Sequence, residues 1–297
     1  MECRNHWTVA VLAVVAAAVV VGEGLATTGA DLPVSGRVRS ADGVEIAYAE
    51  RPGGAVAIVF VHGGLADRTF WAPQFAALPK EYRLVALDLA GHGASGANRD
   101  RWTIAAWAAD VCAVADALKL ERVVLVGNSL GGPVALEAAA LLRGRAIGVI
   151  GVDTLHDATQ KFPEADARAQ AEAYRKDFSG TCRSMVGALF HPGTQAELRG
   201  WAEQRMCGAP RPMAAGMMES LGGYDVAVAF RKAGVPIRAI NGDLWPTHVE
   251  VNRSVTPDFD AVIMKGAGHY PMLERPTEFD RLLVDYVQAL DRAATRR

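Results

Sequence analysis

Residues 124–139 read VLVGNSLGGPVALEAA, and this stretch decides the fold. An apolar, β-branched run stops at Gly127, and a helix-like pattern is under way five residues later. Such a short connection between a buried strand and a helix is typical of an α/β protein. Two interpretations of Ser129 are open: a nucleophile held on a strained turn, or a small residue in a tight connection.

Short apolar runs recur on both sides of that stretch and alternate with helix-like segments. Runs of this kind indicate strands covered by helices on both faces, as in a parallel sheet. We therefore predict an α/β fold with a doubly wound, mostly parallel sheet and right-handed crossovers. The predicted strands are 44–50, 55–62, 83–88, 122–127, 146–152, 236–241 and 259–264, and the predicted helices are 103–119, 131–143 and 276–293.

The interval 157–230 breaks this rhythm, because it lacks a strong strand pattern and is rich in Ala, Met, Glu and Arg. We predict a helical lid here, inserted before the penultimate strand. The core is then divided into a first part at 31–156 and a second part at 231–297. Methionines in such helices are either core or the wall of an adaptable apolar pocket.

Residues 1–30 differ from the rest of the chain. One Arg is followed by WTVAVLAVVAAAVVV, fifteen residues without a charge, and then by small and polar residues. This order is typical of a secretory signal peptide. An uncleaved N-terminal membrane anchor is the alternative, although the run is shorter than the roughly 20 residues of a spanning helix. We expect an exported protein, periplasmic or extracellular.

Export changes the interpretation of the cysteines, because disulfides form in oxidising compartments. Cys182 and Cys207 both lie in the predicted lid, and we predict a disulfide between them. The alternative is a pair of buried small hydrophobic residues. Cys112 falls on the apolar face of a predicted helix and is expected to be a buried free thiol.

The overall composition argues against several classes of partner and cofactor. The chain has 297 residues, of which 51% are hydrophobic and 22% charged, with a formal net charge of −2 and no Lys/Arg-rich run. Nothing in this balance suggests a nucleic-acid partner. The seven histidines lack a metal-ligand spacing, and no phosphate-binding glycine loop is present, so we expect no metal and no cofactor.

Ligands of a doubly wound sheet bind at the carboxyl ends of its strands, so the residues at those ends are the candidate site. Serine, acid and histidine all fall at this edge, in that order along the chain. The strand ends carry His62-Gly63-Gly64, Asp88, Ser129, Asp153, Gly242-Asp243 and, after a short loop, His269.

Gly-x-Ser-x-Gly is a weak motif by itself, but here a strand precedes it and a helix follows it. Side chains at Gly127 or Gly131 would collide across so tight a turn, which forces Ser129 into a strained conformation with an exposed hydroxyl. Leu130 opens the helix, so its N–H points at the same place, with the helix dipole behind it.

With these residues in view, the chain resembles an α/β-hydrolase of the lidded, serine-nucleophile, esterase-like kind, over about residues 34–295. The resemblance rests on VHGG (61–64), DLAGHGAS (88–95), GNSLGG (127–132) and GAGHYPMLERP (266–276). These motifs are specific for the fold and not for a substrate.

The resemblance implies a role for each residue. Ser129 would attack an acyl carbon, and His269 would take the serine proton and return it to the leaving group. The backbone N–H groups of Gly64 and Leu130 would form the oxyanion hole. His62 and His92 are expected to hold their loops rather than to react.

The acid is less well defined. In most of the family it follows the strand after the lid as Gly-x-x-Asp, but here that segment reads INGDLWPTH, and Asp243 stands one residue after its glycine. The other placement follows the strand before the lid, where Asp153 stands 24 residues after Ser129. We favour Asp153 over Asp243, and Asp157 is a poor third. The alternative role for Asp153 is to cap the first lid helix.

Family members that break carbon–halogen bonds or open epoxides have an aspartate at the position of Ser129 and form an alkyl-enzyme ester. A serine at this position excludes that chemistry. The preferred function is a carboxylesterase on small to medium apolar acyl substrates. A lactonase, a carbon–carbon (dienone-acid) hydrolase and a cofactor-free haloperoxidase-like enzyme are the alternatives on the same site. A dienone-acid hydrolase would need a cation for the substrate carboxylate, and Arg68 is the candidate. A binding module without catalysis is a further alternative.

Overall fold

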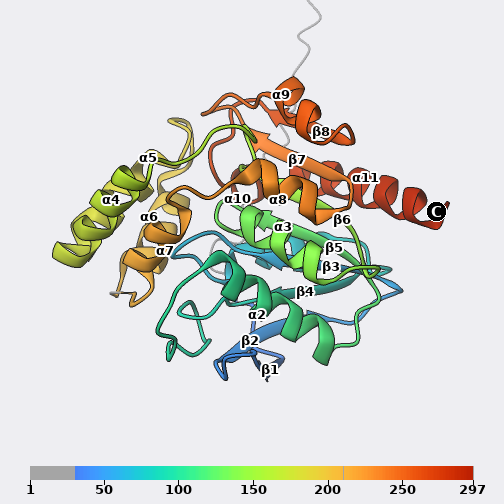
Figure 1. Cartoon of the computed structure of the whole chain (residues 1–297), viewed down its shortest axis with the longest axis horizontal. Helices are drawn as coiled ribbons and strands as arrows, with labels where there is room; N and C mark the ends of the chain where they lie inside the picture. Colours follow the sequence, from blue (N-terminus) through green and yellow to red (C-terminus); the bar gives the residue numbers. More distant parts are fainter. Residues whose placement is uncertain (1–30, 210, 297) are drawn as a thin grey trace, which may run out of the picture.

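An eight-stranded sheet forms the centre of the molecule (Figure 1), in the order β1-β2-β4-β3-β5-β6-β7-β8. The computed structural model describes residues 31–209 and 211–296, so the predicted signal segment lies outside the described residues. The strand β2 is antiparallel to both of its neighbours, β1 and β4. Every other pair of neighbouring strands in this order is parallel. The strands are β1 (Gly36–Arg39), β2 (Glu45–Arg51), β3 (Val56–Val61), β4 (Arg83–Leu87), β5 (Arg122–Asn128), β6 (Ala146–Val152), β7 (Ile237–Gly242) and β8 (Phe259–Met264).

The predicted α/β fold is confirmed, and its physical reason lies in the apolar runs. Every residue of β6 is buried, and β3, β4 and β5 are buried apart from their first residues, because helices cover both faces of the sheet. All seven predicted strands are present within one or two residues of their expected ends. The edge strand β1 was not predicted, because its four residues, GRVR, alternate in exposure and carry no apolar run.

Helices from different parts of the chain cover the two faces. The helix α3 (Gly131–Leu141) contacts α2 (Ile104–Ala117) and α8 (Val226–Ala233) on one face. The helix α11 (Pro276–Thr295) contacts α1 (Ala72–Ala77), β6 and β7 on the other. The three predicted helices 103–119, 131–143 and 276–293 are α2, α3 and α11. Short elements at the ends of strands are η1 (Arg68–Trp71), α9 (Val249–Val255) and α10 (Pro271–Glu274).

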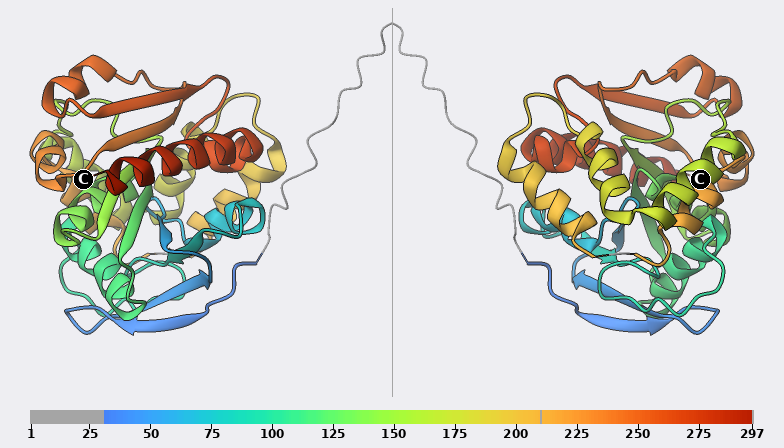
Figure 2. Two further views of the ribbon diagram at one scale, coloured as in Figure 1. Left: turned by 90° about the vertical axis from the view of Figure 1, so that its right-hand side faces the viewer. Right: turned by 90° about the vertical axis from the view of Figure 1, so that its left-hand side faces the viewer.

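The described residues between β6 and β7 form five helices, in the interval where the helical insertion was predicted. Four of them form a group at one end of the sheet (Figures 1 and 2): α4 (Glu164–Lys176), α5 (Phe178–Ala188), α6 (Ala196–Cys207) and α7 (Ala214–Leu221). The fifth, α8, packs on α3 and so belongs to the layer that covers the sheet. We use "the insertion" for α4–α7 and their connecting loops.

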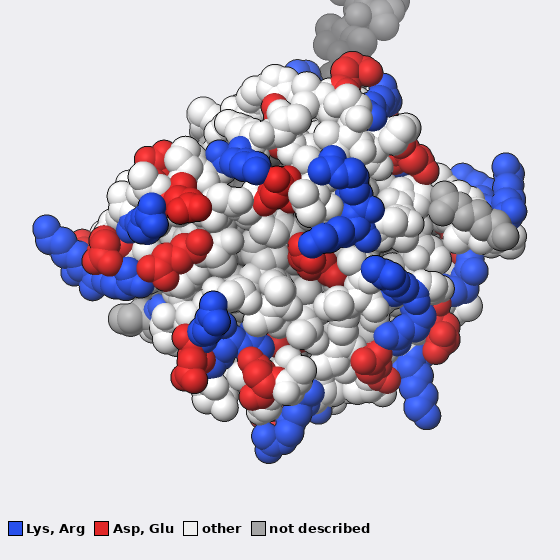
Figure 3. Space-filling model, in the orientation of Figure 1, with Lys and Arg blue, Asp and Glu red and all other residues white. Residues whose placement is uncertain are grey.

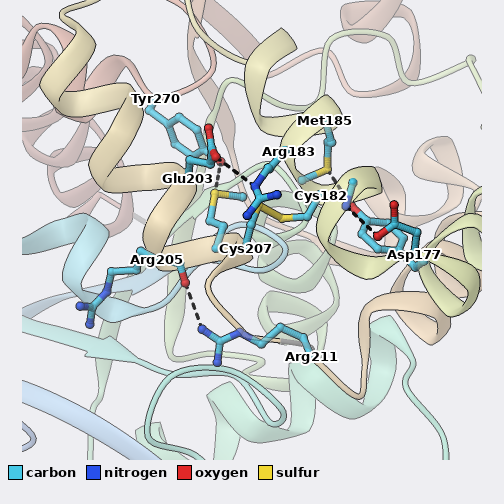
Figure 4. Close-up of a disulfide and its surroundings, with 12 residues drawn as sticks. Asp177, Cys182, Arg183, Met185, Glu203, Arg205, Cys207, Arg211 and Tyr270 are labelled. Atoms are coloured by element: carbon cyan, nitrogen blue, oxygen red, sulfur yellow. Dashed lines mark hydrogen bonds and ion pairs between the residues drawn. A yellow bond between two sulfur atoms is a disulfide. The ribbon is translucent and has the colours of Figure 1, made fainter.

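The predicted disulfide between Cys182 in α5 and Cys207 in α6 is confirmed, with the two Cα atoms 5.6 Å apart. It lies between the two helices beside Tyr270 (Figure 4). Cys112 is a free thiol that is only partly buried, and burial raises its pKa to about 12, which makes it a poor nucleophile.

Removing this disulfide should lower stability markedly. The bond closes a ring across a sequence separation of 25, and cross-links of that length contribute about 3 kcal/mol. We expect Cys182→Ala with Cys207→Ala to lower Tm by roughly 5–10 °C in a thermal melt. The free-thiol variant Cys112→Ala is the control and should shift Tm much less. A double variant that melts with the wild type would contradict this expectation.

The described surface is mixed in charge. On the face shown in Figure 3, Lys and Arg side chains are interspersed with Asp and Glu. Among the described residues, no helix combines the length and apolar character needed to cross a bilayer.

Candidate functional site

The turn after β5 holds Ser129 in the left-handed region of backbone space, with φ 52°. Left-handed backbone costs a non-glycine residue roughly 1–2 kcal/mol, so the surrounding structure must impose it. A Cβ atom at Gly127 would overlap the carbonyl of Gly131, and one at Gly131 would overlap the carbonyl of Val61. Asn128 and Leu130 are buried, whereas Ser129 keeps some exposure. The sequence-based expectation of a strained, accessible serine therefore agrees with the geometry.

Two backbone amides beside this serine are free to bind a ligand. A Cβ atom at Gly63 would lie 3.1 Å from Ser129 Cβ, so the loop after β3 runs along the serine turn. Leu130 lies directly before the first residue of α3. Within residues 31–209 and 211–296, neither the Gly64 N–H nor the Leu130 N–H donates to another protein group. Amides without a protein partner beside the serine are one of the features that an oxyanion hole requires.

Asp153 and His269 meet directly. The imidazole Nδ1 lies 2.6 Å from Asp153 Oδ2, and the Gly242 N–H donates to Oδ1 at 2.9 Å. The Asp153 side chain is fully buried, and its backbone is left-handed, with φ 44°. A buried carboxylate with these partners fixes the ring orientation, with the proton on Nδ1 and the lone pair of Nε2 free for a proton transfer.

Asp243, the alternative acid, points elsewhere. It is exposed, and its Oδ1 accepts a hydrogen bond from the Gly266 N–H at 2.9 Å, which supports the loop that leads to His269. Asp157 accepts hydrogen bonds from Thr159 in a local turn. Asp153 does not cap a helix of the insertion, because α4 begins at Glu164.

Aromatic and polar groups surround the Asp153–His269 pair. The Trp245 ring meets the His269 ring edge-on, with centroids 5.6 Å apart. His156 Nε2 lies 3.8 Å from Asp153 Oδ1. Burial lowers the pKa of His156, although the nearby Asp153 charge opposes that effect. Neutral His156 therefore leaves Asp153 paired with one basic partner, His269.

His62 and His92 hold loops, as expected. His62 is completely buried, its Nδ1 contacts the Gly63 carbonyl at 2.7 Å, and its Nε2 accepts from the Leu89 N–H at 3.1 Å. Burial lowers the pKa of His62 and lowers that of His92 still further. Neutral, buried rings of this kind join the loops after β3 and β4.

Asn128 joins the turn that carries Ser129 (residues 128–131, the serine turn) to the loop that carries His269 (residues 265–270, the histidine loop). Its Nδ2 donates to the Val152 carbonyl at 2.9 Å and to the His269 carbonyl at 3.0 Å. In the described part of the chain, the Ser129 hydroxyl itself makes no hydrogen bond to another protein group. Catalytic hydrogen bonds are often long or absent until substrate is bound, so this absence does not exclude Ser129 from catalysis.

The insertion places methionine and aromatic side chains against the loops that follow the strands. Met217 in α7 lies against Gly64, where a Cβ atom would overlap its Sδ, and Met213 lies close to Gly91. Tyr270 contacts Phe70 and Phe190, with ring centroids 5.3 Å apart in each pair. The predicted methionine-rich segment thus contributes both buried core and groups next to Gly64.

Among the described residues, no three His, Cys, Asp or Glu side chains gather as a metal site would need.

A family model described as the alpha/beta hydrolase family matches residues 58–282, a range that contains Ser129, Asp153 and His269. The chain belongs to the alpha/beta hydrolase family. The resemblance of its motifs to that family is thereby confirmed.

Individual relatives of this hydrolase carry different activities in their names. It is 25% identical to an esterase from Thermogutta terrifontis, with a TM-score of 0.75, over 86% of this chain and 98% of that one. It is also 25% identical to 3-oxoadipate enol-lactonase 1 of Acinetobacter baylyi, over 80% of this chain and 91% of the relative. A third relative is the dihydrolipoyllysine-residue acetyltransferase component of the acetoin cleaving system of Cupriavidus necator, at 26% identity over 82% of this chain. The hydrolase spans 66% of that protein.

Arg68, the cation considered for a substrate carboxylate, is already paired in this hydrolase. Its guanidinium forms a buried ion pair with Asp88 and donates from Nε to the Leu32 carbonyl at 2.9 Å. The backbone N–H of Arg68 also donates to Asp88. Freeing this arginine would leave a buried, unpaired aspartate, which is costly. The main argument for a dienone-acid substrate is therefore lost.

Sequence reasoning missed several groups around the site of this hydrolase, notably Asn128, His156, Trp245 and Glu274. Asn128 occupies the variable position of Gly-x-Ser-x-Gly, where the motif asks for no residue type. Glu274 lies in the GAGHYPMLERP segment, but its contacts join residues up to 80 positions apart. No local pattern reports such contacts.

Proposed function

We propose that this hydrolase is an exported serine carboxylesterase that uses Ser129, His269 and Asp153 as its catalytic triad. The observation that carries the proposal is the buried Asp153–His269 pair, with Nδ1 and Oδ2 2.6 Å apart, at the same sheet edge as the left-handed Ser129. Such a pair makes Nε2 a general base for the serine hydroxyl.

The proposed reaction has two halves. Ser129 Oγ attacks the ester carbonyl while His269 Nε2 takes the hydroxyl proton, and the Gly64 and Leu130 amides bind the oxyanion. Each such donor contributes about 3 kcal/mol to transition-state stabilisation. The protonated imidazole then gives its proton to the leaving alcohol. Water, activated by the same imidazole, hydrolyses the acyl-enzyme.

The insertion acts as a lid in this proposal, and its composition supports an apolar acyl group. Met217 lies against Gly64, one of the two oxyanion amides, so the acyl chain of a bound ester would meet methionine first. Flexible, polarisable methionines suit apolar chains of varied length. Residues 1–30 would direct export as a cleaved signal peptide, or tether the enzyme to a membrane if they are retained.

Lactone hydrolysis is the second candidate, because the enol-lactonase of Acinetobacter baylyi matches 80% of this chain. A lactone is a cyclic ester, so the same triad and oxyanion hole would serve. Acyclic esters are favoured because the methionine-lined edge suits an extended apolar chain.

A p-nitrophenyl ester series tests the proposal. We expect the wild type to hydrolyse acetate to octanoate esters, with the highest kcat/KM at intermediate length, and a simple lactone more slowly. Ser129→Ala should reduce every rate to background. A folded wild type that hydrolyses neither esters nor lactones would overturn the proposal.

A further inference from the structure

The histidine loop is held by groups outside itself at three successive amides. The Gly268 N–H and the Tyr270 N–H donate to Glu274 Oε1 at 3.1 and 3.2 Å. Between them, the His269 N–H donates to the Leu189 carbonyl at 2.7 Å. One carboxylate and one carbonyl thus define the backbone that carries the imidazole.

Both acceptors, the Leu189 carbonyl and the Glu274 carboxylate, connect the histidine loop to the insertion. Leu189 directly follows α5, and the other oxygen of Glu274 accepts a hydrogen bond from the Thr194 hydroxyl. Leu189 and Thr194 both belong to the loop 189–195 between α5 and α6. A Cβ atom at Gly268 would lie 2.6 Å from the His191 N and 2.8 Å from the Leu189 carbonyl. The histidine loop and loop 189–195 are therefore packed backbone to backbone.

The disulfide restrains this same loop. Cys182 and Cys207 close a ring that contains all of loop 189–195. Met206, next to Cys207, accepts a hydrogen bond at its Sδ from the Tyr270 hydroxyl, at 3.3 Å. Figure 4 shows the Tyr270 side chain beside the bridge. The two sides of the disulfide thus both contact the histidine loop, one through Leu189, the residue that follows α5, and the other through Met206 in α6.

We propose that loop 189–195, restrained by the Cys182–Cys207 disulfide, positions His269 through the Leu189 carbonyl and through Glu274, which is a positioning residue. The insertion then has a role in catalysis besides covering the site. Two contacts already restrain His269: its imidazole contacts Asp153, and its backbone carbonyl accepts a hydrogen bond from Asn128 Nδ2. Loop 189–195 adds a restraint on the backbone N–H groups of residues 268–270, so that Nε2 stays directed at Ser129. The proposal rests on the catalytic role proposed for His269 and goes beyond it.

Steady-state kinetics on one ester separate positioning from substrate binding. Glu274→Ala should lower kcat by about 10- to 100-fold, the cost of displacing a reacting group by about 1 Å, while KM changes less than about 3-fold. Glu274→Gln keeps an oxygen for the two amides and a donor for Thr194, so it should restore kcat to within about 3-fold. A KM increase with unchanged kcat in Glu274→Ala would overturn the proposal, as would failure of Glu274→Gln to restore kcat.

Thr194→Val tests the connection without touching the histidine loop. We expect kcat to fall by about 3- to 10-fold, the effect of one lost hydrogen bond. Thr181→Val is the matched control, because its hydroxyl donates to the Ala173 carbonyl within the insertion at 3.1 Å and, among the described residues, makes no hydrogen bond to the histidine loop. Equal kcat values for the two variants would overturn the proposal.

The rate of fluorophosphonate labelling at Ser129 provides a second readout that needs no ester turnover. Thr194→Val and the double variant Cys182→Ala with Cys207→Ala, assayed below their melting temperatures, should label more slowly than Thr181→Val. Labelling without ester hydrolysis would count against the carboxylesterase and leave the positioning test intact. Labelling of both variants at the control rate would overturn the positioning role, even if Glu274→Ala fails to fold.

Discussion

Asp153→Asn is expected to lower kcat by about four orders of magnitude while the protein still folds. Asparagine keeps the size of the side chain, but it stabilises the wrong tautomer of His269 and cannot balance the imidazolium that forms during attack. Ester hydrolysis by the purified variant, with circular dichroism to establish folding, gives the measurement.

Asp243→Asn is the matched control for that substitution. The Asp243 carboxylate is exposed and accepts a hydrogen bond from the Gly266 N–H, and the amide oxygen of asparagine can accept the same hydrogen bond. We expect kcat within about 3-fold of the wild type. If Asp243→Asn is instead the inactive variant, the acid assignment is wrong.

Ser129→Gly should abolish ester hydrolysis and yet give a more stable protein than Ser129→Ala. Loss of the nucleophile is expected to cost about a million-fold in kcat in both variants. Glycine adopts φ 52° without strain, whereas alanine does not, so the glycine variant should be more stable by about 1 kcal/mol.

Thermal melts of the two inactive variants measure that difference directly. A Tm higher by roughly 2–4 °C for Ser129→Gly is the expected result. Equal Tm values would mean that the turn stores no strain at this position. The comparison separates the backbone cost of the serine turn from the chemistry of the hydroxyl.

Much of the fold could be predicted because continuous apolar runs report strands that are buried on both faces. Those runs also placed Ser129, Asp153 and His269 at one sheet edge. The edge strand β1 escaped prediction because it is half exposed and only four residues long. The predicted insertion extended through 230, but α8 carries an apolar stripe that packs on α3, and a helix pattern alone does not say which surface covers that stripe.

The contacts that distinguish Asp153 from Asp243 depend on the loop geometry. Both aspartates follow strands that end at the same edge, so the sequence left both open. The N–H of Gly242, at the end of β7, donates to Asp153, whereas the next side chain, Asp243, accepts a hydrogen bond from the Gly266 N–H. The contacts of Glu274 with Thr194 and with Gly268 were beyond sequence reasoning for the same reason, since only the folded chain brings them together.

Fluorophosphonate labelling of the intact protein tests the central claim, that Ser129 is an activated nucleophile, most directly. We predict one covalent adduct on the wild type, located at Ser129 by peptide mass spectrometry. Ser129→Ala should give no adduct, and Asp153→Asn should label far more slowly. A folded wild type that stays unlabelled, or an adduct that persists in Ser129→Ala, would contradict the account.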